Sequence, residues 1–212
     1  ELFRALAARR AILVPHFLGY CLFQTFGYAV TAWMPTYFMR VHGWSMAETG
    51  FKLGLTQVVF AIVGGLVSGL LARWLWRRGR RDANLLTLAL MFLALLVPAV
   101  VATLMPSGES SLAAMAMVIT FSNAPGGPSS AALQEIIPNR LRGRVTAIYY
   151  TLLSLVGVST GPVVVGLIND YGFRDPASVG KSISLVAALM LPIAAASIFF
   201  AAAQRKKLDW CK

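Results

Sequence analysis

The chain has 212 residues, of which 58% are hydrophobic and only 13% are charged, and its formal net charge is +11. Because a soluble domain carries about a quarter charged residues, this composition indicates an integral membrane protein. The positive charge does not indicate nucleic-acid binding, since the basic residues form clusters between apolar segments and no basic face with interleaved aromatic residues is visible.

Six segments are long and apolar enough to cross a bilayer, which takes about 20 mostly apolar residues. We expect spans at about 12–39, 50–72, 84–105, 111–136, 144–168 and 180–203. The predicted fold is therefore an all-α membrane protein, with residues 1–212 forming one six-helix transmembrane domain. The chain starts at Glu1 without a methionine, and we interpret it as a piece of a longer polypeptide.

Polar or small side chains recur at helical spacing in four of these spans. The four stripes are Tyr20, Gln24, Tyr28 and Thr31; Gly50, Gly54, Gln57, Ala61, Gly64 and Ser68; Thr120, Asn123, Gly127, Ser130 and Gln134; and Thr146, Tyr150, Ser154, Gly157 and Gly161. The third and sixth spans are almost wholly apolar, and we expect lipid around much of their circumference. The pattern predicts four helices around a shared interior.

The amides of Gln24, Gln57 and Asn123 are candidates for a solute site, because an amide in hydrocarbon needs a hydrogen-bonding partner. Hydrogen bonding between helices would satisfy them as well, and this alternative stays open. Tight helix packing is the interpretation that we favour for four small residues, Gly54, Gly64, Gly157 and Gly161.

The fourth span contains "NAPGGPSS", where two prolines and two glycines predict a break in the helix within the membrane. Such breaks in transporters often lie near solute sites, although a plain kink has the same sequence. No Asp, Glu, Lys or Arg lies in the middle of any span. We interpret His16, near the start of the first span, as a hydrogen-bonded interfacial residue and not as a proton carrier.

The basic residues are distributed unevenly between the segments that flank the spans. If successive segments alternate across the membrane, 15 Lys and Arg residues lie on the side of the N-terminus and 4 on the other side. The residues on the N-terminal side are Arg4, Arg9, Arg10, Arg73, Arg77, Arg78, Arg80, Arg81, Arg140, Arg142, Arg144, Arg205, Lys206, Lys207 and Lys212. This bias predicts that both termini are cytoplasmic.

Two segments three spans apart resemble each other. "GGLVSGLLARW", which begins at Gly64, aligns with "GPVVVGLINDY", which begins at Gly161. Because three crossings reverse the direction of the chain, the match predicts an inverted repeat of three helices plus three, as found in transporters.

Two loops resemble motifs of the major facilitator superfamily. "GLLARWLWRRGRR" is similar to its loop motif G-x-L-a-D-x-x-x-R-R-G, and "PNRLRGRVTA" is similar to its P-x-x-x-R-G-R-x-x-A segment. Two further stretches, "WMPTYFMRVHGWSMAETGFKLG" and "GPVVVGLINDYGFRDPASVGKS", look most like bacterial spinster-like members. The resemblance implies the C-terminal six-helix half of a twelve-helix fold.

The resemblance also implies a function. We expect a secondary active transporter in a bacterial inner membrane that moves an amphipathic or lipid-like organic solute by alternating access, with protons as the coupling ion. Its partners would be membrane lipid, the solute and an N-terminal six-helix half, with no nucleic acid, cofactor or metal. The predicted solute-binding residues are Gln24, Tyr28, Thr31, Trp33, Gln57, Asn123 and Tyr150.

The first loop motif departs from the family, because Arg73 stands where the family has an aspartate. We expect Glu135 to be the counter-ion of Arg142 or Arg144. The predicted cytoplasmic gate is then formed by Arg73, Arg77, Arg78, Glu135, Arg142 and Arg144. The alternative is a solvated cluster that sets only the topology, in which each ion pair contributes about 0–1 kcal/mol.

Other functions fit the sequence less well. The chain could transport a small organic anion such as a sugar acid, or act as a homodimer of six-span halves. An intramembrane serine protease would need a nucleophile and a base at matched depth, but the only histidines are His16 and His42 and no G-x-S-x-G occurs. We therefore expect no enzyme activity and assign no catalytic residue.

Overall fold

The computed structural model describes residues 6–210, with side chains as far as Lys206, and all regular structure in this part is helical. The helices are α2 (Arg10–His42), α3 (Met46–Arg77), α4 (Ala83–Val101), α5 (Gly108–Asn123), α6 (Gly126–Ile136), α7 (Arg142–Leu167) and α8 (Val179–Trp210). Short helical turns follow at Ala102–Leu104, Asn139–Leu141, Ile168–Phe173 and Pro176–Ser178. Arg4, the Lys207 side chain and Lys212 lie outside the described residues.

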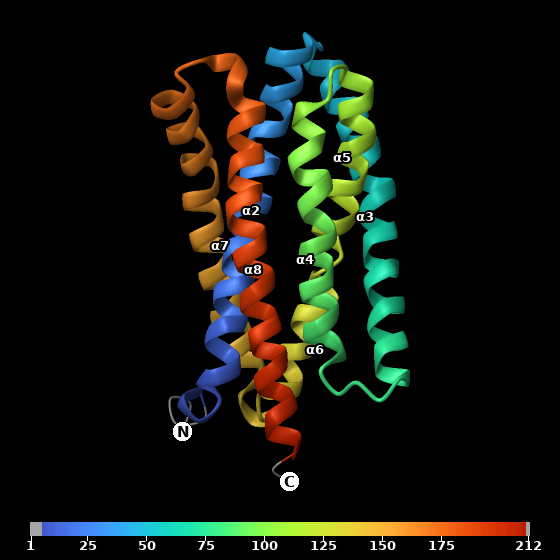
Figure 1. The fold of residues 1–212 in the computed structure, drawn as a ribbon, viewed down its shortest axis with the longest axis vertical. Helices are drawn as coiled ribbons and strands as arrows, with labels where there is room; N and C mark the ends of the chain where they lie inside the picture. The colour runs from blue at the N-terminus through green and yellow to red at the C-terminus, as the bar shows by residue number, and fades with distance from the viewer. Residues whose placement is uncertain (1–5, 211–212) are drawn as a thin grey trace.

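The long helices run side by side along one axis, so that successive loops alternate between the two ends of the bundle (Figure 1). The loop 78–82 and the segment 137–141 lie at the end where α2 begins and α8 ends. We call this end the basic end, because these two segments and the helix ends beside them carry most of the arginines. The loops that contain Arg78 and Arg140 thus share one end of the molecule.

Four helical stretches in the described part of the chain are long and apolar enough to cross a membrane, namely Met46–Arg77, Ala83–Leu104, Asn139–Phe173 and Pro176–Lys206. They include four of the segments expected to be spans. The predicted span 12–39 lies within α2, which has 33 residues. The predicted span 111–136 is divided between α5 and α6, which have 16 and 11 residues and are each shorter than one crossing.

The break between α5 and α6 falls within "NAPGGPSS", where the sequence predicts it. The first helix ends at Asn123 and the second begins at Gly126. Pro125 and Pro128 have no backbone N–H to donate, and their rings clash with the carbonyl groups one turn earlier in a regular helix. The proline pair therefore accounts for the interruption.

The helix α2 lies at the centre of the packing, between α7 and α8. Its side chains Phe26, Tyr37 and Phe38 are fully buried, and Phe23 stacks on Phe92 of α4 with ring centroids 4.6 Å apart. Gly19 of α2 allows α8 to approach closely, because a methyl group on Gly19 would lie only 2.7 Å from the carbonyl oxygen of Ala194. These contacts form the core of the bundle.

The apolar helices α4 and α8 are more buried than the sequence pattern indicates. Of the most apolar 18-residue stretch in each helix, half is buried in α4 and only 11% is buried in α3. The reason is that α4 and α8 pack against each other and α8 packs against α2, while only their outer faces, with Val97 and Leu189, are exposed. The striped helices α3 and α7 are instead the least buried of the four stretches.

Three of the four small residues interpreted as packing positions do mediate close helix contacts. A methyl group on Gly64 of α3 would overlap the carbonyl oxygen of Thr120 on α5, and one on Gly161 of α7 would overlap that of Thr25 on α2. A methyl group on Gly157 would lie 2.5 Å from the ring of Tyr28. The interpretation is wrong for Gly54, since a methyl group there would meet no atom within 4 Å.

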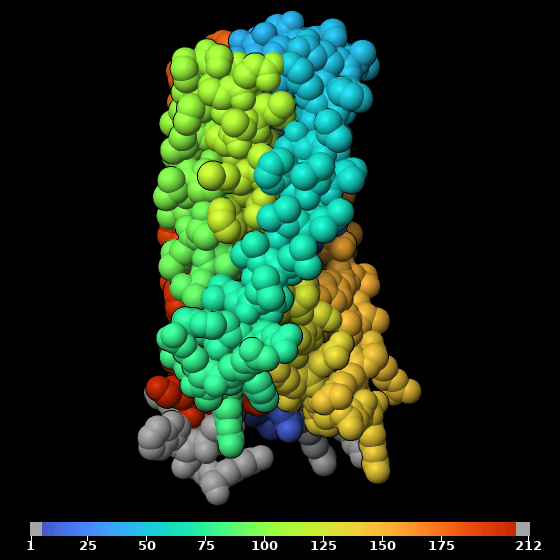
Figure 2. All heavy atoms as spheres, turned by 90° about the vertical axis from the view of Figure 1, so that its right-hand side faces the viewer, coloured from blue at the N-terminus to red at the C-terminus, as the bar shows by residue number. Residues whose placement is uncertain are grey.

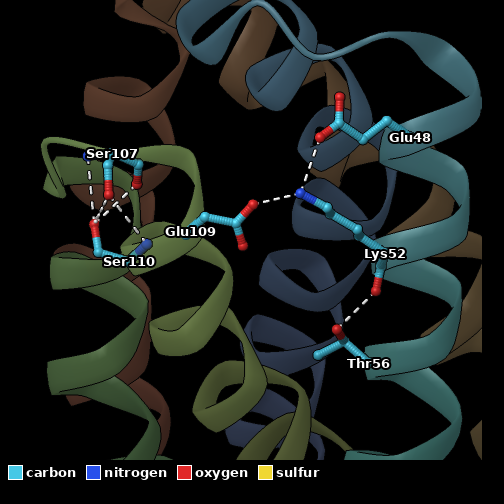
Figure 3. A network of polar contacts seen from close by, with 6 residues as sticks. All are labelled: Glu48, Lys52, Thr56, Ser107, Glu109 and Ser110. Atoms are coloured by element: carbon cyan, nitrogen blue, oxygen red, sulfur yellow. Dashed lines mark hydrogen bonds and ion pairs between the residues drawn. The ribbon is translucent and has the colours of Figure 1, made fainter.

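At the end opposite to the basic end, a lysine joins α3 to α5 (Figure 3). The Nζ of Lys52 lies 2.9 Å from a carboxylate oxygen of Glu48 one turn earlier, and it also pairs with Glu109 at the start of α5. The same ammonium group lies 4.2 Å from the ring centroid of Trp44. This network fixes the spacing of the two helix ends.

Candidate functional site

The polar stripes of α2, α3 and α5 meet at a cavity of about 270 Å³. Its lining residues are Phe23, Gln24, Gly27, Tyr28, Val30, Thr31, Gln57, Val118, Ile119, Ser122 and Asn123. They lie near the middle of α2 and α3 and at the end of α5, directly before the break in the fourth predicted span. The cavity thus lies far from both ends of the bundle.

Five of the seven predicted solute-binding residues line this cavity, namely Gln24, Tyr28, Thr31, Gln57 and Asn123. The Thr31 hydroxyl donates to the Gly27 carbonyl oxygen at 2.9 Å, and the Asn123 amide donates to the Ile119 carbonyl oxygen at 2.8 Å. Each of these bonds stays within one helix, so neither Thr31 nor Asn123 joins two helices in the described part of the chain.

The other two predicted residues are not among the lining residues of this cavity. The indole N–H of Trp33 donates to the carbonyl oxygen of Pro162 at 2.9 Å and so joins α2 to α7. Tyr150 packs edge-on against Tyr149, with ring centroids 5.2 Å apart. The prediction relied on aromatic rings with polar tips, and this property does not distinguish a cavity wall from a contact between helices.

Sequence reasoning missed several residues of the wall, among them Gly27, Ser122 and Phe23. Gly27 lies three residues after Gln24 and so shares its helix face, whereas Ser122 is only the neighbour of Asn123 in the chain. A search for every small or hydroxyl residue beside the predicted amides would have found Gly27 and Ser122. Phe23 has no such signal, because most of its side chain belongs to the buried core.

A second cavity of about 460 Å³ adjoins the first. Four residues, Val30, Thr31, Gln57 and Ile119, line both cavities. The remaining lining residues of the second cavity are Met34, Pro35, Leu53, Gly54 and Met115, none of which has a polar side chain apart from the thioethers. The two cavities form one space with a polar part and an apolar part.

At the basic end, Glu135 and Arg73 line a smaller cavity of about 250 Å³ with Asn84 and Trp76. A carboxylate oxygen of Glu135 accepts a hydrogen bond from the Asn84 amide at 2.7 Å. This bond joins the end of α6 to the start of α4. Glu135 therefore holds two helices of the chain together at this end.

The pairing expected for Glu135 does not occur, since no ion pair joins it to Arg142 or Arg144 among the side chains that the structure describes. The guanidinium of Arg142 donates instead to the Ile137 carbonyl oxygen at 3.2 Å, just before its own helix, and Arg144 is exposed. The reason is local: Glu135 ends α6 beside α4, whereas both arginines lie on the first turn of α7.

The arginines at the end of α3 form a separate group. Arg73 and Arg77 line one exposed hollow with Trp74, and the guanidinium carbon of Arg78 lies 3.8 Å from the Trp74 ring centroid. A guanidinium over an indole ring is stabilised by the ring quadrupole. Four of the six predicted gate residues, Arg73, Arg77, Arg78 and Glu135, thus lie at the ends of α3 and α6. The other two, Arg142 and Arg144, lie at the start of α7.

The prediction for His16 was wrong. Its side chain is fully buried, and neither ring nitrogen has a hydrogen-bond partner in the described part of the chain. The ring stacks on Tyr149 of α7 with centroids 5.4 Å apart and an interplanar angle of 6°. Across residues 6–206, no three His, Cys, Asp or Glu side chains gather closely enough to hold a metal ion.

Comparison with known proteins places this geometry in a family. Residues 1–162 match the family model described as Major Facilitator Superfamily. An MFS-type efflux pump of Mycolicibacterium smegmatis is 28% identical over 193 residues, which are 89% of this chain and 44% of the pump.

Two solved structures of a bacterial homolog to the human lysosomal transporter Spinster have the same fold. The inward-facing, unoccupied form aligns with a TM-score of 0.65 and 20% identity over 95% of this chain and 48% of the homolog. The inward-facing, occupied form aligns with a TM-score of 0.59 and 18% identity over 91% of this chain and 48% of the homolog. The chain spans about half the length of these relatives. With most of its length matching the family model, the chain belongs to the Major Facilitator Superfamily.

Proposed function

We propose that this chain is the C-terminal half of a secondary transporter that moves an amphipathic organic solute across a bacterial inner membrane by alternating access. The observation that carries this proposal is the convergence of Gln24, Gln57 and Asn123, from three different helices, on one cavity. Their amides supply hydrogen-bond donors and acceptors at mid-height in a helix bundle, where transporters of this family type hold their solutes.

The adjoining apolar cavity supports an amphipathic solute over a small anion. Met34, Leu53 and Met115 offer an apolar surface directly beside the amides. No Lys, Arg or His is among the lining residues of either cavity, so this half supplies no cation for an anionic group. No acid lines them either, and we therefore propose that any proton carrier lies in the other half.

The exposed faces of α3 and α7 support a second half as partner. Figure 2 shows α3 lying on the outside of the bundle along its length. Phe51, Leu55, Ile62 and Leu66 are each more than half exposed on α3, and Leu155 is 65% exposed on α7. This chain matches only about half the length of its relatives, which agrees with our proposal that an N-terminal half covers these faces.

Six crossings with an inverted three-plus-three repeat remain our proposal for the topology. In this scheme α5 and α6 together make the fourth crossing. The aligned residues Gly64 and Gly161 support it. Gly64 brings α3, the second crossing of the first triplet, against α5 in the first crossing of the second triplet, and Gly161 brings α7, the second crossing of the second triplet, against α2, the first crossing of the first. The shared location of the arginine-rich loops supports a cytoplasmic basic end, with both termini on that side.

For the gate, we propose that Arg73 and Glu135 are the central pair, with Arg77 and Arg78 beside them. Arg142 and Arg144 then face the N-terminal half and make contacts that change during the transport cycle. Their place on α7, whose outer face is exposed, supports this assignment.

The solute site is tested by transport into proteoliposomes that contain the full-length protein. The probes are three tritiated amphipaths with the same alkyl chain: an N-alkyl acetamide, an alkyl trimethylammonium and an alkyl sulfate. We expect Gln24→Ala and Asn123→Ala to weaken the apparent affinity for a transported probe about 2- to 10-fold, the effect of one lost hydrogen bond. Gln134→Ala removes an exposed amide outside the cavity and is the matched control. Wild-type affinity and rate in both cavity variants would refute the site.

A further inference from the structure

The two cavities differ in polarity and are stacked along the bundle axis. On α2, Gln24 lines the polar cavity and Met34 lines the apolar one. α2 runs away from the basic end, so Met34 is about 15 Å further from that end than Gln24 at the rise of a regular helix. The apolar cavity therefore lies on the side of the polar cavity that faces the opposite end.

The other two helices agree, although they run in the reverse direction. On α3, Leu53 of the apolar cavity precedes Gln57, and on α5, Met115 precedes Asn123 of the polar cavity. Because α3 and α5 both begin at the end opposite to the basic end, the apolar residues again lie nearer that end. Three helices thus give the same order of polarity along the axis.

The hydrogen-bonding capacity of the polar cavity is largely unused. Neither Gln24 nor Gln57 makes a side-chain hydrogen bond to another described residue. Each amide offers two donors and a carbonyl acceptor. Thr31, at the boundary with the apolar cavity, has given its only proton to Gly27 and can only accept. The polar part therefore presents both donors and acceptors, and no formal charge.

We infer that this half holds its solute in one orientation. An uncharged head group that both donates and accepts hydrogen bonds lies at Gln24, Gln57 and Asn123. An apolar tail extends from Thr31 toward the end opposite to the basic end, between Met34, Leu53 and Met115. The inference rests on the proposed function and adds the chemical class of the head group and the direction of the tail.

Charge supports an uncharged head group. An ion placed among these residues would lose its hydration without gaining an opposite charge, and this is costly in a low-dielectric site. A neutral amide or hydroxyl head loses less hydration and recovers its hydrogen bonds from the three amides. In the apolar cavity, binding is then stabilised in proportion to the apolar area that the tail buries.

Two residues without side chains make a clean test possible. Gly27 lines the polar cavity and Gly54 lines the apolar cavity, and a methyl group on either would meet no atom within 4 Å. The Cβ atom of a leucine at either position therefore displaces no neighbour, and the larger side chain starts in open space. Gly50, one turn before Gly54 on α3, is equally open but lines neither cavity, so Gly50→Leu is the matched control.

The measurement is equilibrium binding of tritiated N-alkyl acetamides with short and long chains to proteoliposomes of the full-length protein, with protein-free liposomes subtracted. In the wild type we expect affinity to rise up to about fourfold per added methylene, which corresponds to about 0.8 kcal/mol. Gly54→Leu should remove this gain and leave short-chain binding unchanged. Gly27→Leu should weaken short and long chains alike, and Gly50→Leu should match the wild type.

A second arm tests the head group with an alkyl trimethylammonium and an alkyl sulfate of the same chain length. We expect both to bind at least tenfold more weakly than the acetamide. Gln57→Glu should reverse the preference in favour of the cation, because it introduces a carboxylate beside the head group.

The outcomes separate the two proposals. Equal weakening by Gly54→Leu and Gly27→Leu at every chain length would overturn the orientation, as would equal or tighter binding of the ionic amphipaths by the wild type. If an ionic probe is nevertheless transported and depends on Gln24 and Asn123, the proposed function stands without the inference. If no probe is transported, the proposed function fails independently of the binding data.

Discussion

Gly64 of α3 lies directly against the carbonyl oxygen of Thr120 on α5, with no room for a side chain between them. This contact brings Gln57 and Asn123, two turns or less away on the same helices, to one cavity. The absence of a side chain at position 64 therefore sets the distance between two walls of the proposed solute site.

The first prediction concerns this contact. Gly64→Ala should destabilise the full-length protein by about 1–3 kcal/mol, because the new methyl group overlaps backbone that cannot move without separating α3 from α5. The thermal midpoint of the purified protein in detergent measures the effect. Gly65→Ala adds the same methyl group where nothing lies within 4 Å, and it should leave the midpoint unchanged or slightly raised. Equal midpoints for the two variants would contradict the prediction.

The second prediction separates Trp33 from the cavity. Trp33→Phe removes the donor to the Pro162 carbonyl oxygen and should lower stability by about 0.5–1.5 kcal/mol. It should leave the affinity for a transported solute at the wild-type value, in contrast to Gln24→Ala. Thermal unfolding and proteoliposome uptake on the same preparation provide both readouts. A loss of affinity without a loss of stability would return Trp33 to the solute site.

The third prediction concerns the partner of Glu135. Because Arg73 lines the same cavity, exchanging the charges in Glu135→Arg with Arg73→Glu should restore transport that each single variant loses. The exchange of Glu135 with Arg144 should not, since Arg144 lies on the first turn of α7 and is not among the residues that line this cavity. Rescue by the Arg144 exchange alone would restore the pairing expected from the sequence.

The fourth prediction is a pH dependence at the loop 78–82. The guanidinium of Arg80 donates to both carboxylate oxygens of Asp82 at 2.8 and 2.7 Å and lowers the pKa of that carboxyl group. A lowered pKa in the folded state means that the stabilisation is complete above the unfolded value, about 3.9, and is lost as pH falls through the folded value.

Asp82→Asn should therefore lower the thermal midpoint at neutral pH. The difference from the wild type should shrink only as the pH drops below about 4. Thermal unfolding of both proteins from neutral pH to about pH 3 measures this. Asp175→Asn, at the opposite end, serves as a comparison. The Asp175 carboxylate, whose pKa is also lowered, accepts hydrogen bonds from the Ala177 N–H and the Ser178 hydroxyl, and no arginine pairs with it among the described side chains. A constant difference across the whole range would refute the pairing as its cause.

The fifth prediction concerns the network at the opposite end. Lys52→Met removes the ammonium group that pairs with Glu48 and Glu109 and keeps most of the side-chain volume. It should lower the thermal midpoint at low salt, and the difference should diminish as added salt screens the exposed ion pairs. Lys181→Met, a lysine at the start of α8, is the control. A salt-independent loss would assign the effect to the contact with Trp44 instead.

Periodicity and proline chemistry predicted much of this molecule. The stripe from Gln24 to Thr31 and the amide of Asn123 pointed to one interior, and they line one cavity. Both signals are local: a helix repeats every 3.6 residues, and a proline interrupts it wherever it stands.

Contacts between distant segments were beyond the same reasoning. Trp33 meets Pro162 across 129 residues, and Asn84 meets Glu135 across 51. The arrangement of the helices in space determines which polar group a carboxylate contacts, and the spacing of residues along the chain does not predict it. The environment of His16 was predicted wrongly for the same reason, since its ring stacks on Tyr149 of a different helix.

The proline pair between α5 and α6 also has a mechanical consequence. The 11 residues of α6 make a rod roughly 16 Å long, and Pro125 and Pro128 remove two of the backbone N–H donors that would stiffen its join to α5. A tilt of about 10° at this hinge would displace the far tip, where Glu135 lies, by roughly 3 Å, as much as a hydrogen bond is long. The two ends of α6 thus lie at the break beside Asn123, in the proposed solute site, and at the hydrogen bond between Glu135 and Asn84.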